Sequence, residues 1–189
     1  MKYGEVLRKS VHVSAIVIPL GVWFMEPIYW RPLLYLATVL IVAMDLTRLK
    51  HDRLKAYVRS MVGRSLRKHE DYELTGASYM VIACLLVAEL FPLDVAVVSM
   101  GYLIVGDGVA GLIGKSWGRH RLAFGKSWEG TLSALFANLA VGLLVFQRPA
   151  PAILGAFLGT VVELLPLPLD DNLAIPLMAG GILWAAIAL

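Results

Sequence analysis

The distribution of apolar residues constrains this chain more than any other feature of its sequence. Seven apolar stretches, each about as long as a segment that crosses a bilayer, make up most of the 189 residues. They lie near residues 11–30, 32–47, 74–93, 95–114, 128–147, 150–166 and 172–189. Hydrophobic residues form 59% of the sequence and charged residues only 16%, which is outside the range of water-soluble domains. We therefore expect an all-α, polytopic bundle of transmembrane helices, with residues 1–189 forming a single integral membrane domain.

Two of the seven stretches are less regular than the others. Pro19 interrupts the first, and Glu163 and Pro166 interrupt the sixth. The pattern therefore predicts about seven spans and leaves six spans open.

Basic residues divide unequally between the two sides of the predicted membrane. If the N-terminus is cytoplasmic and seven spans alternate, all of the 17 Lys and Arg residues except Arg31 and Arg148 fall in cytoplasmic segments. Cytoplasmic loops of membrane proteins carry such an excess of positive charge. The sequence thus predicts a cytoplasmic N-terminus, with the loops around residues 48–70 and 115–127 on the same side.

The one long polar segment, residues 48–70, mixes basic residues with apolar residues at helical spacing. This pattern predicts an amphipathic helix on the cytoplasmic surface of the membrane. A basic linker attracted to anionic lipids explains the composition about as well. The segment has few aromatic residues and no recognition motif, which argues against binding to nucleic acid.

Asp107 lies inside an apolar stretch, in the sequence Gly106-Asp107-Gly108. A carboxylate at membrane depth is costly, and it indicates a functional site whose partner is a cation or a metal ion. The small residues Gly106, Ala110 and Gly114 recur at steps of four, which predicts close contact with another helix. A glycine-rich loop with several cations follows, namely Lys115, Arg119, Arg121 and Lys126.

The loop between the fourth and fifth stretches has the features of an anion site. It offers exposed backbone N–H groups, lysines and the start of the next helix at Ser127–Gly130. An ordinary basic loop is the alternative. Gly-Lys-Ser occurs twice, at 114–116 and 125–127, but the upstream glycine and the preceding strand of a Walker A motif are missing.

Other polar residues are predicted on the same cytoplasmic side. Taken singly, each is explained by helix capping or by a long side chain that reaches for water. Their convergence at one depth favours an active site, and carboxylates beside a phosphate-binding loop favour Mg²⁺ as the cofactor. This set consists of Arg8, Lys9, His12, Asp45, Glu73, Thr75, Asp170, Asp171 and Asn172.

Several motifs, in order along the chain, carry a family resemblance. They are Glu5-x-x-Arg8-Lys9-x-x-His12, Asp45-x-x-Arg48, Glu73-Leu74-Thr75-Gly76, Gly106-Asp107-x-x-Ala110, Gly114-Lys115-x-x-Gly118-Arg119, Lys126-Ser127-x-Glu129-Gly130-Thr131, and Asp170-Asp171-Asn172 with Pro176. With this set the chain resembles the dolichol kinase, phytol kinase and CTP-dependent diacylglycerol kinase family of integral membrane enzymes. More distantly it is similar to the phosphatidate cytidylyltransferases.

The resemblance implies CTP-dependent transfer of a phosphoryl group to a membrane lipid alcohol of the polyprenol, phytol or diacylglycerol type. Together with the distribution of basic residues, it predicts an enzyme of the plasma (inner) membrane whose active site faces the cytoplasm. The cytidylyltransferases have Ser-Pro-Lys where this chain has Phe124-Gly125-Lys126, which favours the kinase. A cytidylyltransferase-like enzyme that makes a CDP-lipid is the alternative, and a non-catalytic lipid transporter or scaffold is the least favoured reading. The lipid, the choice of CTP over ATP and the oligomeric state, including a homo-oligomer, are left open.

The resemblance and the chemistry of phosphoryl transfer together give each site residue an expected role. We expect Asp107 to bind Mg²⁺, with Asp170 or Asp171 as a second ligand or as the base towards the lipid hydroxyl. We expect Glu129 to orient Lys126 or the metal ion, and His12 is a less favoured base. The expected phosphate-binding residues are Arg8, Lys9, Lys115, Arg119, Lys126 and Ser127.

Overall fold

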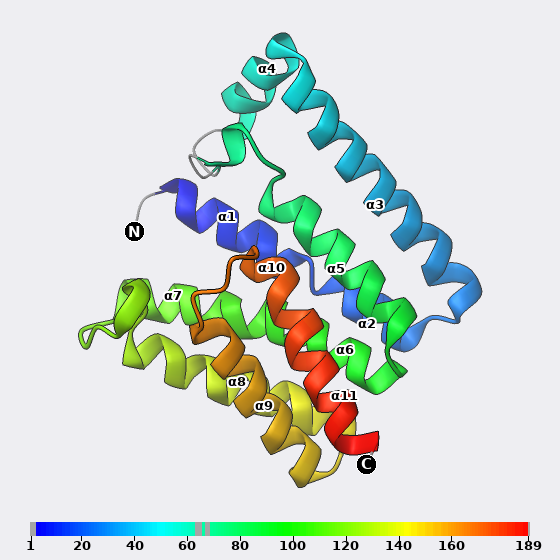
Figure 1. Cartoon of the computed structure of the whole chain (residues 1–189), viewed down its shortest axis with the longest axis vertical. Helices are drawn as coiled ribbons and strands as arrows, with labels where there is room; N and C mark the ends of the chain where they lie inside the picture. Colours follow the sequence, from blue (N-terminus) through cyan, green and yellow to red (C-terminus); the bar gives the residue numbers. More distant parts are fainter. Residues whose placement is uncertain (1–2, 63–65, 67–68, 189) are drawn as a thin grey trace.

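The computed structural model describes residues 3–62, 66 and 69–188, which fold into helices joined by short connections (Figure 1). Within these ranges there is no strand, and one isolated β-bridge joins Arg121 and Ser127. The predicted all-α class is confirmed.

The helices follow one another closely along the chain. They are α1 (Tyr3–Ser14), α2 (Val17–Phe24), α3 (Pro27–Lys50), α4 (Asp52–Val62), η1 (His69–Asp71), α5 (Gly76–Leu90), α6 (Leu93–Gly101), the π-helix η2 (Tyr102–Asp107), α7 (Gly108–Ser116), η3 (Ala123–Gly125), α8 (Trp128–Phe146), α9 (Pro149–Leu164), α10 (Asp171–Ala174), the π-helix η4 (Ile175–Ala179) and α11 (Gly180–Ala188). Helices α6, η2 and α7 follow one another without a gap, as do α10, η4 and α11.

Four helices in the described part of the chain are long and apolar enough to cross a membrane. They are Pro27–Lys50, Leu93–Ser116, Trp128–Phe146 and Asp171–Ala188. Helices α5 and α9 are apolar but shorter, with 15 and 16 residues. The count of about seven spans therefore stays a prediction.

The first predicted stretch, residues 11–30, is divided between three helices instead of forming one. Pro19 has no N–H group, and its ring crowds the carbonyl group of Ala15, so the helix breaks between α1 and α2. A second break follows α2, where Met25 has extended backbone angles. Pro27 then begins α3 at a position where proline costs no hydrogen bond.

The continuous run from α6 through η2 is the centre of the bundle. Tyr102, Leu103 and Ile104 are at most 1% exposed, and α8, α9 and α11 pack around this run. Helix α3, by contrast, exposes a row of large apolar side chains, namely Leu33, Leu36, Val39, Leu40 and Met44. Such a surface is costly in water and is the expected surface in a bilayer.

The predicted ridge of small residues is confirmed as a contact between α7 and α8. A Cβ atom added to Gly130 of α8 would lie 2.9 Å from the carbonyl oxygen of Ala110 and 3.1 Å from Cα of Gly114. A Cβ atom on Gly106 would collide with the side chain of Asn138. The two helices therefore meet backbone to backbone, which brings the start of α8 next to α7.

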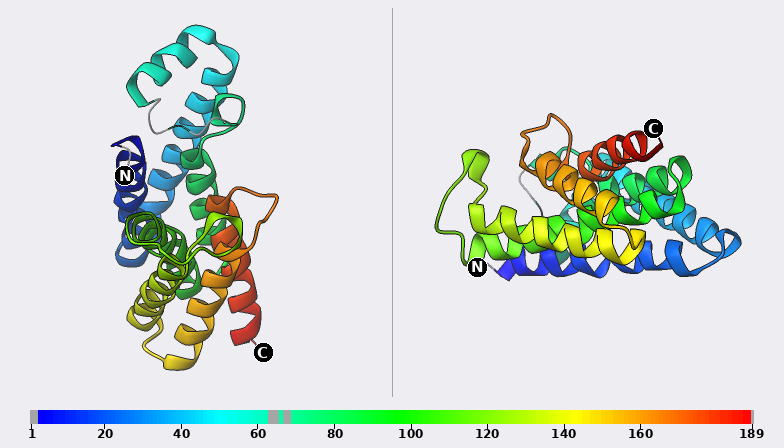
Figure 2. Two further views of the ribbon diagram at one scale, coloured as in Figure 1. Left: turned by 90° about the vertical axis from the view of Figure 1, so that its left-hand side faces the viewer. Right: turned by 90° about the horizontal axis from the view of Figure 1, so that it is seen from below.

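The polar segment 48–70 is helical over its described middle part. Helix α4 packs against the end of α3 and stands apart from the rest of the bundle (Figures 1 and 2). Arg64, Arg67 and Lys68, which belong to the predicted basic surface, lie outside the described residues.

The predicted orientation can be tested by chemical labelling of single cysteines. In a Cys84→Ala background, we expect Asp52→Cys and His120→Cys to react with a membrane-impermeant thiol reagent only from the cytoplasmic side, because both positions lie in basic segments. Arg148→Cys is the matched control and should react only from the opposite side. Labelling of position 52 or 120 from outside would contradict the orientation.

Candidate active site

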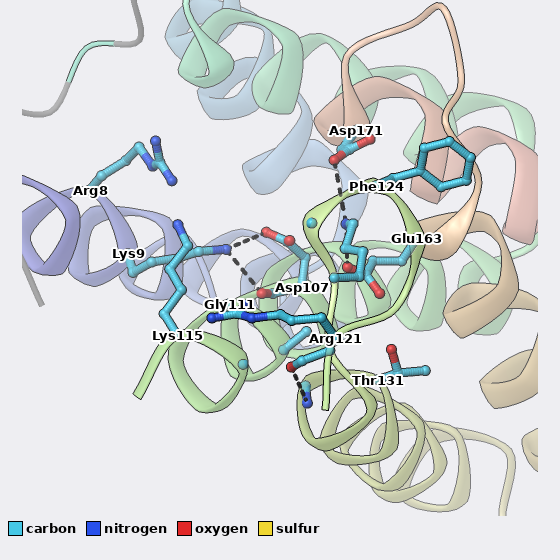
Figure 3. A pocket seen from close by; sticks show the side chains of 16 residues that line it. Arg8, Lys9, Asp107, Gly111, Lys115, Arg121, Phe124, Thr131, Glu163 and Asp171 are labelled. Carbon is cyan, nitrogen blue, oxygen red and sulfur yellow. Dashed lines mark hydrogen bonds and ion pairs between the residues drawn. The ribbon is translucent and has the colours of Figure 1, made fainter. Parts of the chain in front are cut away.

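A cavity of about 220 Å³ lies where the ends of several helices meet. Five cationic side chains and three carboxylates line it, so its lining is net positive (Figure 3). The cationic residues are Arg8, Lys9, Lys115, Arg121 and Lys126, and the carboxylates are Asp107, Glu163 and Asp171. These residues come from α1, η2, α7, the loop before α8, α9 and α10. The fold therefore gathers charges from distant parts of the sequence around one space.

Lys9 and Asp107 form the first ion pair of this cavity. The ammonium group of Lys9 lies 2.7 Å from Oδ2 of Asp107 and donates a second bond, of 3.0 Å, to the backbone carbonyl of the same residue (Figure 3). Gly111 makes this reach across α7 sterically feasible, because a Cβ atom there would collide with the Lys9 side chain. The cation that partners the buried carboxylate thus comes from α1, about 100 residues away in sequence.

Lys126 and Glu163 form the second pair. Nζ of Lys126 donates to Oε1 of Glu163 at 2.5 Å and lies 3.9 Å from Oδ2 of Asp171. Burial lowers the pKa of Lys126, but the nearby carboxylate charges, Glu163 first and then Asp171 and Asp107, outweigh it, so the pKa is raised overall. Lys126 therefore stays cationic at neutral pH.

A tight loop presents Lys126 to the cavity. Leu122 N–H donates to the carbonyl group of Lys126, and Trp128 N–H donates to that of His120. Between these bonds the chain reverses at Phe124 and Gly125, both with positive φ (59° and 77°). Glycine adopts this conformation freely, whereas for Phe124 it is a local strain that the surrounding bonds maintain.

The expected helix start is confirmed at Ser127. Its backbone is extended, and its Oγ accepts a hydrogen bond from Gly130 N–H, so it caps α8. Ser127, Gly130 and Thr131 all line the cavity. The first turn of α8 therefore faces the same space as the cationic side chains, which suits a bound anion.

Four of the expected site residues lie elsewhere. Arg119 is exposed and does not line the cavity. Nε2 of His12 donates to the carbonyl oxygen of Leu103 at 2.9 Å and lies 3.6 Å from Oδ2 of Asp107, and His12 does not line the cavity. Asp170 caps α10 by accepting from Asn172 N–H.

Glu129 is the fourth of these residues, and its partner differs from the expected one. Its carboxylate lies 2.8 Å from Nδ1 of His120, and it does not line the cavity. Among the described residues, Lys126 instead pairs with Glu163 and, at 3.9 Å, with Asp171.

Sequence reasoning did not assign Glu163, Arg121 or Thr131 to specific roles. Glu163 was visible only as a charge that interrupts an apolar stretch, and that interruption was the available signal. Arg121 was visible as a loop cation, and it occupies the cavity wall where Arg119 was expected. Thr131 had no distinguishing signal beyond its place in the Glu-Gly-Thr motif.

Asp45 and Arg48 belong to a separate polar network that does not line the cavity. Arg48 is 2% exposed, and its Nε donates to Oδ1 of Asp45 at 2.8 Å. Its other two nitrogens donate to the carbonyl groups of Glu70 and Glu73. The guanidinium group thus ties the end of α3 to the segment before α5.

The two carboxylates of this network hold the start of α5. Oδ2 of Asp45 accepts from Thr75 N–H and Ser78 Oγ, at 2.6 and 2.8 Å. Oε1 of Glu70 accepts from Gly76 N–H at 2.9 Å. The cytoplasmic polar residues were expected to converge on one site, but they are divided between this network and the cavity.

The donors at the cavity suit Mg²⁺ only if the substrate supplies part of its coordination shell. Among the described residues, no group of three or more His, Cys, Asp or Glu side chains is placed to hold a metal ion. Asp107 and Asp171 nevertheless face the same cavity with carboxylate oxygens. Mg²⁺ often binds proteins through one or two carboxylates, with phosphates and water as its other ligands. The two residues fit that mode.

Comparisons with known proteins found relatives along most of the chain. An uncharacterised protein of Rickettsia prowazekii is 29% identical, over 92% of this chain and 90% of its own length. The phytol kinase of Synechocystis is 30% identical, over 96% of this chain and 79% of its own length. The CTP-dependent diacylglycerol kinase 1 of Schizosaccharomyces pombe is 26% identical, over 74% of this chain and 73% of its own length. No family model and no solved structure matches the chain.

Proposed function

The chain belongs to the dolichol kinase, phytol kinase and CTP-dependent diacylglycerol kinase family, and from this premise we propose that it is a lipid kinase. It transfers the terminal phosphoryl group of CTP to the hydroxyl group of a membrane lipid alcohol. The observation that carries this proposal is the net positive cavity, which combines five cations with three carboxylates. Phosphoryl transfer requires positioning and charge neutralisation more than covalent chemistry, and this lining can supply both.

The cationic residues bind the phosphates of the nucleotide. Lys126, Arg121 and Lys115 reach the cavity from the loop and from α7, and Arg8 and Lys9 reach it from α1. The first turn of α8 adds backbone N–H groups on the same side. Because negative charge spreads over the phosphate oxygens during transfer, donors that are already fixed around them lower the barrier.

Asp107 and Asp171 are the proposed residues for Mg²⁺. An ion held there would supply positive charge that offsets the charge of the phosphates. Lys9 neutralises Asp107 in the free protein and would share it with the ion. Asp171 lines the cavity and is 38% exposed, which supports a second proposed role for it, as the base that accepts the proton of the lipid hydroxyl.

The lipid alcohol reaches the site from the bilayer and the nucleotide from the cytoplasm. Exposed apolar side chains on the long helices support insertion into a membrane, which we propose to be the plasma (inner) membrane. The excess of basic residues around the cavity and α4 supports a site that faces the cytoplasm. A membrane lipid would then present its hydroxyl group at the same depth as the phosphates.

The reaction can be tested with purified protein in detergent. We expect label from γ-labelled CTP to enter a lipid alcohol, and α-label to remain in CDP. The lipids offered as acceptors should be a polyprenol, phytol, diacylglycerol and phosphatidate. ATP at the same concentration serves as a competing donor, and a chelator of Mg²⁺ serves as the control.

The products also separate the two enzyme hypotheses. A cytidylyltransferase would release labelled pyrophosphate from γ-labelled CTP and would move α-label into a phosphatidate-derived lipid. That result would contradict the kinase proposal. The kinases among the relatives favour transfer of the γ-label to a lipid alcohol.

A further inference from the structure

We propose that Glu163 is a positioning residue for phosphoryl transfer: it holds the ammonium group of Lys126 at the place where the phosphates of the nucleotide bind. This inference rests on the proposed function. It concerns a residue that lies outside all the motifs that carry the family resemblance.

The geometry gives Glu163 a fixed place beside a movable lysine. Glu163 is the penultimate residue of α9, and its side chain is 6% exposed. Lys126 lies on the loop before α8, and its side chain is 27% exposed. Both residues line the cavity, with 2.5 Å between Nζ and Oε1. The rigid helix therefore provides the carboxylate, and the loop provides the cation.

The pair is poorly arranged as a purely structural ion pair. Oε2 of Glu163 is buried and accepts no hydrogen bond from any residue that the structure describes. A buried carboxylate contributes to stability only when its remaining lone pairs are also satisfied. A carboxylate in an apolar helix with one unsatisfied oxygen is costly, and such groups indicate function. Stability alone therefore does not account for Glu163.

Positioning of Lys126 does account for it. A lysine on a loop has a flexible side chain, and one carboxylate contact selects a single direction for its ammonium group. The ion pair, with Nζ 2.5 Å from Oε1 of Glu163, holds that group at the cavity before the nucleotide arrives. Groups that are fixed before the reaction avoid the cost of reorganisation during it. By analogy, protein kinases also use a glutamate to hold a phosphate-binding lysine.

The cavity repeats this arrangement on its other wall. There, Asp107 of η2 holds Lys9 of α1, with 2.7 Å between Oδ2 and Nζ. Two of the three lysines that line the cavity are thus each held by a carboxylate that lies on a different element. In the proposed enzyme, these two pairs set the distance between the cations that receive the phosphate chain.

The test compares Glu163→Gln with a matched carboxylate elsewhere in the protein. We expect Glu163→Gln to raise the KM for CTP about 10- to 100-fold, as residues that orient a ligand-holding group do, and to leave the KM for the lipid alcohol unchanged. Glu163→Asp should recover part of the loss. Glu89→Gln is the control, because Glu89 also lies in an apolar helix and pairs with Arg31 at 3.0 Å, away from the cavity. It should leave both KM values unchanged.

A double-mutant cycle tests whether Glu163 acts through Lys126. Lys126→Met alone would leave Glu163 buried without its cation, so the cycle includes Lys126→Met/Glu163→Gln, which removes both charges. We expect the Glu163 substitution to have no further effect on CTP affinity once Lys126 is methionine. An unchanged KM for CTP in Glu163→Gln would overturn the proposal, and so would an equal loss with and without Lys126.

The binding readout keeps this inference separate from the proposed function. Equilibrium dialysis with labelled CTP measures affinity for each variant without any lipid. If the wild-type protein binds CTP but phosphorylates no lipid alcohol, the proposed function fails, and the affinities of the variants still decide the role of Glu163. Melting temperatures in detergent should agree within a few degrees between Glu163→Gln and Glu89→Gln. A much lower value for Glu163→Gln alone would contradict a positioning role.

Discussion

Asp107→Asn is expected to lower kcat by about 100-fold or more, while the protein still inserts into the membrane and can be purified. The substitution keeps the size and shape of the side chain and removes the charge that faces Lys9 and the cavity. A lost electrostatic group at a transition state costs about 10²- to 10³-fold in rate. Lys9 would keep its 3.0 Å hydrogen bond to the backbone carbonyl of residue 107, which limits the structural damage.

Phosphate transfer from labelled CTP, measured at saturating lipid, checks this prediction. Asp94→Asn is the matched control, because Asp94 lies near the start of the same continuous helix and bonds only to Val95 N–H in the described contacts. It should retain nearly full activity. Turnover close to the wild-type rate in Asp107→Asn would mean that the carboxylate only pairs with Lys9.

A titration with Mg²⁺ separates a metal-binding role of Asp107 from a pairing role. If Asp107 holds the ion, Asp107→Asn should also shift half-maximal activity to a higher Mg²⁺ concentration. If its only role is to hold Lys9, Lys9→Met should cause the same loss, and the dependence on Mg²⁺ should stay unchanged in both variants.

Much of the fold follows from apolar patterning, because a bilayer-length run of apolar residues has few alternatives to a helix. The divided first stretch was less predictable. Pro19 was visible in the sequence as an interruption, but the second break, at the extended backbone of Met25, has no signal in the hydropathy. The two π-helices, Tyr102–Asp107 and Ile175–Ala179, also carry no hydropathy signal. The first ends at Asp107, which is consistent with the frequent occurrence of π-helices at functional sites.

The site was predictable where its residues are close in sequence. The loop cations and Asp107 stand within one segment, so their chemistry can be read directly. Glu163 could not be assigned, because its partner Lys126 lies 37 residues away and its neighbours are apolar. Glu129 was expected to orient Lys126 or the metal ion from the resemblance and the chemistry of phosphoryl transfer, but the loop brings His120 against Glu129 instead.

The second large effect is expected on stability, from Arg48→Met. Arg48 is buried at 2% exposure and donates to Asp45 and to the carbonyl groups of Glu70 and Glu73. Methionine would leave a buried carboxylate without its cation, and both carbonyl groups without this donor. Removal of one partner from a buried pair costs about 3–5 kcal/mol in the free energy of unfolding. We expect the melting temperature in detergent to fall clearly below that of the wild-type protein.

Arg31→Met is the matched control for this prediction. Like Arg48, Arg31 pairs with a carboxylate, that of Glu89 at 3.0 Å, but the Arg31 side chain is 51% exposed, and exposed pairs contribute about 1 kcal/mol or less. An equal loss of melting temperature in both variants would contradict the importance of the buried network.

Arg48→Met should in addition lower activity, because Gly76 at the start of α5 packs against the side chain of Asn172, the neighbour of Asp171. A network outside the cavity thus holds the helix against which Asp171 is placed, which explains how Asp45-x-x-Arg48 supports the site without lining it.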